Sequence, residues 1–341
     1  MLQTLRSLPS RLRRNPGYVV LFLLAAGALY ELVLKPEAGP TSHHRFVASD
    51  GSAVIEWEQS RPFTGYALPT ADDRALYVYD VGRSSSQLTA LDPSNGQTVW
   101  TVGRSGIRRI LTNAISVFVA TATSVTAYDP TNGYEQWSTA IGAGHVKVVP
   151  ALSEPTLLIF YGGSVVELLT SNGLKLQDQA RGDLLWVAGK VEIHEGPQGM
   201  FARDHMTGEL LWRSYLTPFD VYETSPPVDV PPTGLLIHHQ MEDLCMLDLQ
   251  SGNVNWCTSG PFLSNAVIDL TRSRAYVLDS GFDLVALDIS TGAAEIISSF
   301  PIDSPGTGPT NMLYEYWLAT SGDRLFLYLG DSWQLLALSI R

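Results

Sequence analysis

Two kinds of side chain that do chemistry in proteins recur at fixed places along this sequence. Aspartates stand four residues before a glycine, and tryptophans stand four residues after one. Converging carboxylates would offer oxygen ligands to a divalent cation, and exposed indoles would offer surfaces on which a planar ligand stacks. The aspartates are Asp92, Asp129, Asp204, Asp248 and Asp288, and the tryptophans are Trp100, Trp137, Trp212 and Trp256. Because each set holds one place in successive copies of a phrase, we expect turn formation and packing between copies instead.

Other chemistry-bearing residues are few. His238 and His239 are neighbours on an expected strand, so their side chains point to opposite faces and cannot share one metal ion. His43 and His44 fall in an expected linker, where we expect them to be solvated. The sequence holds no Gly-x-Ser-x-Gly, no His-Glu-x-x-His and no Cys/His spacing that suits zinc. We therefore predict no catalytic residues, no metal ligands and no cofactor.

The repeated phrase is Asp-x-x-(Ser/Thr/Asn)-Gly-x-x-x-Trp, preceded by a short strand. Full copies are Leu88–Trp100, Val125–Trp137, Met200–Trp212 and Leu244–Trp256, and degenerate copies are Val165–Gln177 and Leu284–Ile296. Their glycines, Gly96, Gly133, Gly173, Gly208, Gly252 and Gly292, are separated by 37, 40, 35, 44 and 40 residues. A period near 40 residues is typical of β-propellers, in which each copy forms one four-stranded blade.

Each position of the phrase has a physical reason. Glycine adopts the positive φ that a tight turn needs, and an aspartate at the start of the turn can bind nearby backbone N–H groups. A tryptophan on the outgoing strand can bury a large area against the next blade while its N–H finds an acceptor; we call its place the docking position. Alanine stands two residues before the aspartate position, where a small side chain lets sheets approach closely, at Ala90, Ala127, Ala202, Ala286 and Ala337.

Seven further strands, rich in β-branched and aromatic residues, lie upstream of the phrases and predict seven blades. They are Ala75–Tyr79, Ser116–Thr121, Thr156–Tyr161, Leu184–Ala188, Gly234–His238, Ala275–Leu278 and Leu325–Leu329. The final half copy, Leu335–Ser339, lacks an outgoing strand, and Ala53–Trp57 matches the missing one. We predict an all-β, seven-bladed propeller of four-stranded blades, closed by antiparallel pairing of these two segments; eight blades are the alternative.

The phrase resembles the tryptophan-docking repeat of PQQ-like, quinoprotein-type propellers over Phe46–Arg341. This resemblance implies a structural docking role for Trp57, Trp100, Trp137, Trp212 and Trp256. Quinone-dependent dehydrogenases of this kind have eight blades on a longer chain, a bound calcium ion, an aspartate base and often adjacent cysteines. Here the cysteines are twelve residues apart and little sequence remains for cofactor-binding insertions, so the resemblance implies a scaffold without quinone chemistry.

The two cysteines, Cys245 and Cys257, lie on the strands that flank the Ser251-Gly252 turn, at nearly equal distances from it. In an oxidising compartment, a cross-strand disulfide between them is one expectation. The alternative is two separate buried thiols that behave as small hydrophobic groups.

The N-terminus suggests attachment to a membrane. The chain carries a net charge of −12, and four arginines with no acid in residues 1–16 leave −16 on the rest. The apolar segment 17–34 would be about 27 Å long as a helix, enough for one transmembrane signal-anchor. A cleaved signal ending at Ala28, a mitochondrial presequence and a buried core helix are the alternatives. The expected domains are therefore a basic segment 1–16, an anchor 17–34, a linker 35–45 and a propeller 46–341.

These features predict a non-catalytic, membrane-anchored scaffold that binds membrane proteins or subunits of a membrane complex. The alternative is a quinone-dependent oxidoreductase or a small-ligand binder that uses the central channel. The acidic body would repel phosphates, so nucleic acid is not an expected partner. Basic residues before the anchor place the propeller on the non-cytoplasmic side, in the ER lumen, the mitochondrial intermembrane space or the periplasm. Candidate binding loops are Thr217–Thr233, which is proline-rich and too irregular for a strand, and Pro301–Pro309.

Overall fold

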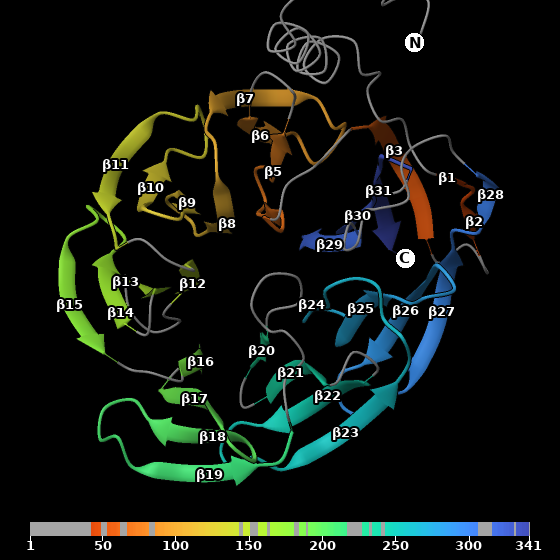
Figure 1. Ribbon diagram of the computed structural model, residues 1–341. Helices are drawn as coiled ribbons and strands as arrows, with labels where there is room; N and C mark the ends of the chain where they lie inside the picture. The colour runs from red at the N-terminus through yellow and green to blue at the C-terminus, as the bar shows by residue number, and fades with distance from the viewer. Residues whose placement is uncertain are drawn as a thin grey trace, which may run out of the picture.

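The computed structural model shows seven β-sheets arranged in a ring (Figure 1). It describes residues 42–48, 53–61, 67–81, 86–142, 146–150, 156–161, 164–180, 184–188, 190–216, 227–231, 234–239, 243–305, 316–330 and 332–340. Within these ranges every regular element is a strand. No helix among them is long and apolar enough to cross a membrane. The basic segment 1–16 and the predicted anchor 17–34 lie outside the described residues.

The sheets follow one another around the ring in chain order, and we number them as blades. Blade 1 contains β4 (Thr70–Ala71), β5 (Leu76–Val81), β6 (Ser86–Leu91) and β7 (Thr98–Gly103). Blade 2 contains β8 (Ile107–Thr112), β9 (Val117–Thr121), β10 (Ser124–Tyr128) and β11 (Glu135–Ala140). Blade 3 contains β12 (Val146–Pro150), β13 (Thr156–Tyr161), β14 (Ser164–Leu169) and β15 (Lys175–Ala180). Blade 4 contains β16 (Leu184–Ala188), β17 (Val191–Gly196), β18 (Gly199–Asp204) and β19 (Leu210–Ser214).

The remaining strands complete the ring. Blade 5 contains β20 (Val228–Val230), β21 (Gly234–His239), β22 (Asp243–Asp248) and β23 (Val254–Ser259). Blade 6 contains β24 (Val267–Asp269), β25 (Arg274–Leu278), β26 (Asp283–Asp288) and β27 (Ala294–Ser299), with β2 (Val47–Ala48) added beside β27. Blade 7 contains β29 (Tyr316–Ser321), β30 (Arg324–Leu329), β31 (Gln334–Ile340) and β3 (Ala53–Ser60). A separate pair joins β1 (Ser42–His44) to β28 (Ile302–Pro305).

The ring closes within blade 7, where the first long strand of the chain pairs with the last. β3 is antiparallel to β31, with Ala53 opposite Ile340 and Trp57 opposite Ala337. Seven four-stranded blades and this closure confirm the two main predictions about the fold. The pairing covers an edge that blade 7 would otherwise leave open.

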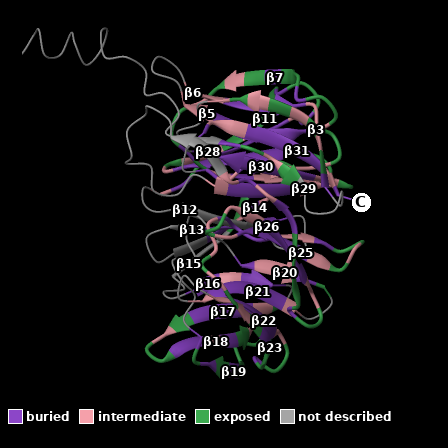
Figure 2. Ribbon diagram, turned by 90° about the vertical axis from the view of Figure 1, so that its right-hand side faces the viewer, coloured by how far each residue is buried: buried purple, intermediate pink, exposed green. Residues whose placement is uncertain are grey.

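The position of a strand in its blade explains its sequence pattern. Middle strands such as β9 and β30 are buried over nearly their whole length, because a neighbouring blade covers each of their two faces. Outer strands such as β7 and β23 alternate between buried and exposed residues, because solvent reaches one of their faces. Figure 2 shows this difference as purple middle strands and green along outer strands and turns. A continuous apolar run therefore indicates a middle strand here, and an alternating run indicates an outer strand.

Each pair of adjacent blades shares its own apolar cluster. Between blades 1 and 2, for example, Tyr77 and Leu88 pack with Val117 and Val119. Between blades 6 and 7, Leu284 and its neighbours pack with Leu327 and Leu338 of the other sheet. The stabilising contacts therefore lie between blades, and removal of any one blade would expose two apolar faces.

Two expectations about local structure were wrong, and one predicted strand has another place in its blade than expected. His44 is buried instead of solvated, because β1 pairs with β28 and places the imidazole Nδ1 2.6 Å from the Phe300 oxygen. The predicted strand Leu184–Ala188 is present as β16, but it is the innermost strand of blade 4, and the strand directly before the repeat phrase is β17. The segment Thr217–Thr233 contains β20, although residues 217–226 lie outside the described part of the chain.

Candidate functional site

The repeated aspartates shape the turn of their own blade. Asp248 Oδ1 accepts hydrogen bonds from the Ser251 N–H at 2.8 Å and the Ser251 hydroxyl at 2.8 Å, and the Gly252 N–H donates to the Asp248 carbonyl at 2.8 Å. Comparable bonds lower the pKa of three of these carboxyls, chiefly those from the Ser94 hydroxyl to Asp92, the Thr207 N–H to Asp204 and the Ser290 hydroxyl to Asp288. Their oxygens therefore serve backbone and hydroxyl groups of the turn.

Each of the five docking tryptophans contacts the turn of the following blade. The indole N–H donates to the backbone oxygen of the residue after the aspartate position, at 2.7–2.9 Å. The donor and acceptor pairs are Trp57 and Pro93, Trp100 and Pro130, Trp137 and Thr170, Trp212 and Leu249, and Trp256 and Ile289. The tryptophans thus link consecutive blades and are not free to stack on a ligand.

The repeat glycine is required by the indole as well as by the turn. Gly252 has φ of +71°, and a Cβ added to it would lie 2.5 Å from Cδ2 of Trp212. Gly133 stands in the same relation to Trp100, at 2.7 Å from Cε3. Only glycine both permits the turn and leaves room for the ring. We call the turn from the aspartate position to the residue after the glycine a tryptophan seat.

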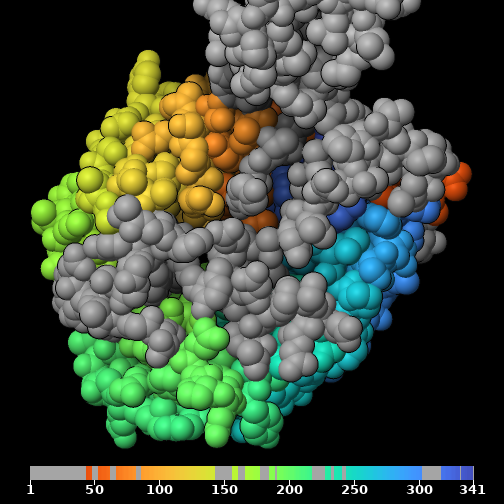
Figure 3. Space-filling view, in the orientation of Figure 1, coloured from red at the N-terminus to blue at the C-terminus, as the bar shows by residue number. Residues whose placement is uncertain are grey.

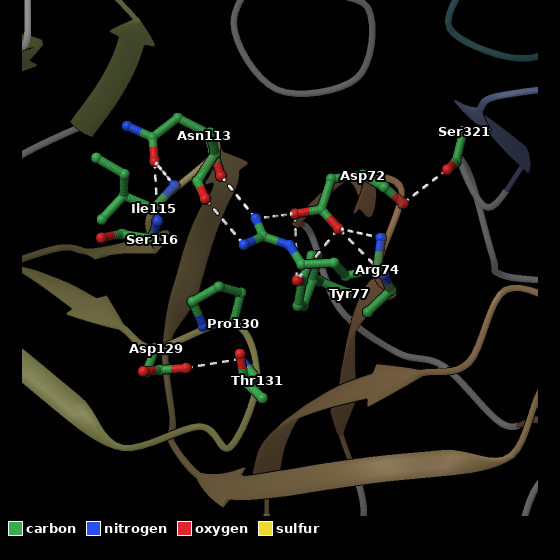
Figure 4. A network of polar contacts seen from close by, with 12 residues as sticks. Asp72, Arg74, Tyr77, Asn113, Ile115, Ser116, Asp129, Pro130, Thr131 and Ser321 are labelled. Atoms are coloured by element: carbon green, nitrogen blue, oxygen red, sulfur yellow. Dashed lines mark hydrogen bonds and ion pairs between the residues drawn. The ribbon is translucent and has the colours of Figure 1, made fainter.

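A second link between blades lies at the turns that join first and second strands. The Arg74 guanidinium donates to Asp72 Oδ2 at 2.7 Å and to the backbone oxygens of Asn113 and Ala114, each at 2.9 Å (Figure 4). The Ser321 hydroxyl donates to the Asp72 carbonyl at 2.6 Å. The hydrogen bond with Asp72 is the main cause that raises the pKa of Arg74. These groups tie blades 7, 1 and 2 together and are engaged with one another.

The seat of blade 4 differs from the other five. Its glycine, Gly208, is exposed, whereas Gly96, Gly133, Gly173, Gly252 and Gly292 are buried. The docking position that faces it, on the outer strand of blade 3, is occupied by Gln177 instead of tryptophan, and the side chain of Gln177 is outside the described part.

Exposed apolar residues accompany this seat. Met206 lies within it and is 78 % exposed, and Leu210 and Leu211 follow it on β19, both exposed. Leu174 and Leu176 are exposed on the outer edge of blade 3, in the segment that leads to Gln177. These five residues, which we call the apolar rim, belong to two blades that adjoin each other in the ring (Figure 3). Exposed apolar groups on neighbouring elements are candidates for a protein-interaction surface.

Buried polar groups lie behind the rim on blade 4. Ile193 faces blade 5, so Glu192 and His194, its neighbours along β17, point to the opposite face. Glu192 Oε2 is 3.2 Å from His194 Nε2, and its Oε1 is 2.8 Å from His205 Nδ1. Glu192 and His194 are both buried. Sequence reasoning missed this cluster because Val191–Gly196 contains too many polar residues to resemble a middle strand; its signal was the alternation of Glu192 and His194 with an isoleucine.

Two titratable groups lie on innermost strands, around the axis of the ring. Burial lowers the pKa of Arg109 on β8 to about 10. Burial raises the pKa of Asp229 on β20 to about 6, while a hydrogen bond of 3.3 Å from the Trp186 indole opposes that shift. Of the residues that the structure describes, no three His, Cys, Asp or Glu side chains lie together so as to hold a metal ion.

His238 and the cysteines belong to blade 5. Burial lowers the pKa of His238 to about 4, and among the described residues its Nε2 has no hydrogen-bond partner. Cys245 and Cys257 are directly opposite each other on β22 and β23 and are joined by a disulfide with an S–S distance of 2.07 Å. Cys245 is buried in the cluster that holds Trp212. The disulfide therefore fastens the outer strand of blade 5 to the strand that packs on blade 4.

The comparison with known families identifies the repeat. The model of the family described as outer membrane protein assembly factor BamB matches residues 41–198 and 121–266. The chain belongs to this family. Its PQQ-like repeats are thus shown, as the resemblance in the sequence indicated. No curated protein matches the chain.

Solved structures share the fold of this BamB-family chain at low sequence identity. BamB from Moraxella catarrhalis is 16 % identical with a TM-score of 0.54, and the match covers 89 % of this chain and 96 % of that one. A structure of BBS1N in complex with ARL6DN is 11 % identical with a TM-score of 0.60, and the match covers 85 % of this chain and 97 % of that one. A chain of the mitotic checkpoint complex is 10 % identical with a TM-score of 0.65, and the match covers 89 % of this chain and 96 % of that one. At these identities the likenesses show the propeller fold alone.

Proposed function

We propose that this chain is a non-catalytic scaffold, anchored to a membrane by residues 17–34, that binds subunits of a membrane protein complex. The observation that carries the proposal is the apolar rim beside the exposed Gly208 seat. The repeated aspartates, glycines and tryptophans act within and between blades, so the surface of the ring is what remains for partners. The BamB family and two structural neighbours that were solved in protein complexes support this proposal.

The propeller is proposed to lie on the non-cytoplasmic side of that membrane. The disulfide between Cys245 and Cys257 supports this placement, because such bonds persist in oxidising compartments. The arginines that precede segment 17–34 support it as well. Thiol alkylation of the protein in intact cells, before and after reduction, tests the point. Two freely alkylated cysteines without reductant would contradict it.

The experiment on function compares two triple variants of the full chain. One replaces Met206, Leu210 and Leu211 by serine and removes the blade 4 part of the rim. The control replaces Val99, Ile115 and Tyr134, which are also exposed but lie on blades 1 and 2, by serine. Crosslinking in native membranes followed by affinity recovery should lose partner subunits with the first variant and keep them with the control.

Two results would overturn the proposal. One is recovery of the same partners with both triple variants. The other is oxidation of an alcohol or sugar by the purified full chain when quinone and calcium are supplied, which would show that the chain is an enzyme.

A further inference from the structure

The seat of blade 4 has the same backbone as the seats that hold tryptophan. The Gly208 N–H donates to the Asp204 carbonyl at 2.8 Å, as the Gly252 N–H does to the Asp248 carbonyl at 2.8 Å. The Asp204 N–H in turn donates to the Glu209 carbonyl at 2.9 Å. Both glycines have φ of +71°. The seat is therefore formed before anything binds to it, so an occupant would not have to order it.

The seats differ in the side chain that the preceding blade places against the glycine. In five seats an indole from the preceding blade covers the glycine, and the glycine is buried. Gly208 has an exposed surface although the preceding blade is in place, and the docking position of that blade carries Gln177 instead of tryptophan. The five other seats thus show which side chain fits a turn of this kind, namely the indole of a tryptophan.

The surroundings of Gly208 suit an aromatic side chain from outside. Met206, Leu210 and Leu211 supply apolar surface within and after the seat. The Arg203 guanidinium donates to the Gly208 carbonyl at 3.4 Å and lies 5.5 Å from the centre of the Phe201 ring. A guanidinium so placed can also contact the face of an incoming indole. The apolar surface and the guanidinium can together receive a flat aromatic ring, and the tryptophans in the other five seats show that the turn accepts an indole.

We propose that the Gly208 seat receives a tryptophan from a partner protein, presented on an extended segment with apolar neighbours, in the manner in which the outer strands of the ring present their own. The inference rests on the proposed scaffold function and names the chemistry of its partner. The indole is the central contact, and the rim packs against the residues beside it. Tryptophan anchors in such pockets often dominate the affinity of an interface.

The structure supplies a probe for the test. A synthetic peptide with the sequence of Thr98–Gly103, TVWTVG, copies the outer strand of blade 1, whose Trp100 sits on the seat of blade 2. With 5-fluorotryptophan in the peptide, its 19F signal should broaden and shift when the full-length protein is added. The same strand with alanine in place of tryptophan should compete at least roughly 30-fold less well, as expected when an anchor worth 2 kcal/mol is lost.

Two variants locate the binding site. Gln177→Trp places an indole at the docking position of blade 3 and should abolish the 19F response by filling the seat from within. Gly322→Val is the control, because Gly322 also has positive φ but lies in blade 7 with open space around it, and it should leave the response unchanged. No response with the wild-type chain, an equal response with Gln177→Trp, or equal competition by the alanine peptide would each overturn the proposal.

Failure of this inference can be told from failure of the scaffold function. If Gln177→Trp still recovers the membrane partners while the serine variant of Met206, Leu210 and Leu211 loses them, the scaffold stands and the tryptophan seat is refuted. If the peptide binds as described but neither variant affects recovery, the seat is supported and the proposed partner surface fails.

Discussion

Blade 4 meets its two neighbours in different ways. Toward blade 5 it presents Trp212, which docks beside Gly252, and an apolar cluster that includes Ile193. Toward blade 3 it presents the buried Glu192 and His194, and its own seat glycine, Gly208, is exposed. Blade 4 therefore has a locked seam on one side and, at the seam on the other side, an exposed seat. The difference shows that the seat without a facing tryptophan is also the one whose glycine is exposed, and it is there that we propose a partner binds.

The largest expected effect tests the locked seam. Trp212→Ala should lower the free energy of unfolding by about 3–5 kcal/mol, because a buried indole and its hydrogen bond to Leu249 are lost. Gln177→Ala, the equivalent change in blade 3, should lower it by less than about 1 kcal/mol. Chemical denaturation followed by tryptophan fluorescence and circular dichroism gives both values. Equal losses would remove the distinction between the seams.

The glycines of the two seats provide a second comparison. Gly252→Ala should cost about 3–4 kcal/mol, since alanine is strained at positive φ and its Cβ would overlap the Trp212 ring. Gly208→Ala should cost about 1–2 kcal/mol from the strain alone. Thermal unfolding of both variants under identical conditions checks the order. A larger loss at Gly208 would mean that its seat is covered.

The disulfide joins β22 and β23 of blade 5, beside the locked seam between blades 4 and 5. Reduction of Cys245–Cys257, or replacement of both by alanine, should lower the free energy of unfolding by about 3 kcal/mol, because a closed loop of twelve residues is released in the unfolded chain. Denaturation with and without reductant measures the effect. The triple serine variant of the rim, which keeps the disulfide, should respond to reductant as the wild type does.

The smallest effect concerns pH and the inner end of the seam between blades 4 and 5. Asp229 has a pKa of about 6 in the folded chain, above its ordinary value, so the folded state binds the proton more tightly. The free energy of unfolding should therefore fall as pH rises from about 4 to 6, by about 1–2 kcal/mol given its partial exposure. Asp229→Asn should abolish that slope and be the more stable form at pH 8.

His238 offers a control of opposite sign within the same blade. Its pKa of about 4 lies below the ordinary histidine value, so the unfolded chain binds the proton more tightly. This group makes the folded state lose stability as pH falls from about 6.5 to 4. His238→Leu should thus flatten the acid side of the profile, whereas Asp229→Asn should steepen the rise of stability with pH. Identical profiles for the two variants would contradict both assignments.

Much of the fold could be predicted because the repeat encodes it locally. Glycine, aspartate and tryptophan each have a role within one turn or against the next one, so Gly252 and Trp212 were recognisable from their spacing alone. The short innermost strands were missed because β4 and β20 contain only two and three residues, too few to show a period. The burial of His44 depended on pairing with a strand more than two hundred residues away, which no local pattern reveals.

The candidate site was less accessible to prediction. The sequence showed that Gln177 replaces a tryptophan, but only the structure shows that Gly208 is exposed. Exposure of Met206 or Leu210 likewise depends on how neighbouring sheets pack, because the same residue types are buried on middle strands. Of the candidate loops Thr217–Thr233 and Pro301–Pro309, residues 217–226, 232–233 and 306–309 lie outside the described residues. The second segment is not wholly a loop, because Ile302–Pro305 forms β28. The role of both segments in binding stays a prediction.

The closure of blade 7 also determines when its strands can pair during biosynthesis. Residues of β3 leave the ribosome well before those of β31, with which they pair. At ordinary rates of translation the early strand waits roughly 15–60 s for its partner. During that time the backbone groups of β3 lack their native partner strand, although Trp57 can already dock on the turn of blade 1, and strand edges of this kind promote aggregation. A nascent chain that stalls before residue 334 is therefore the form most in need of a chaperone.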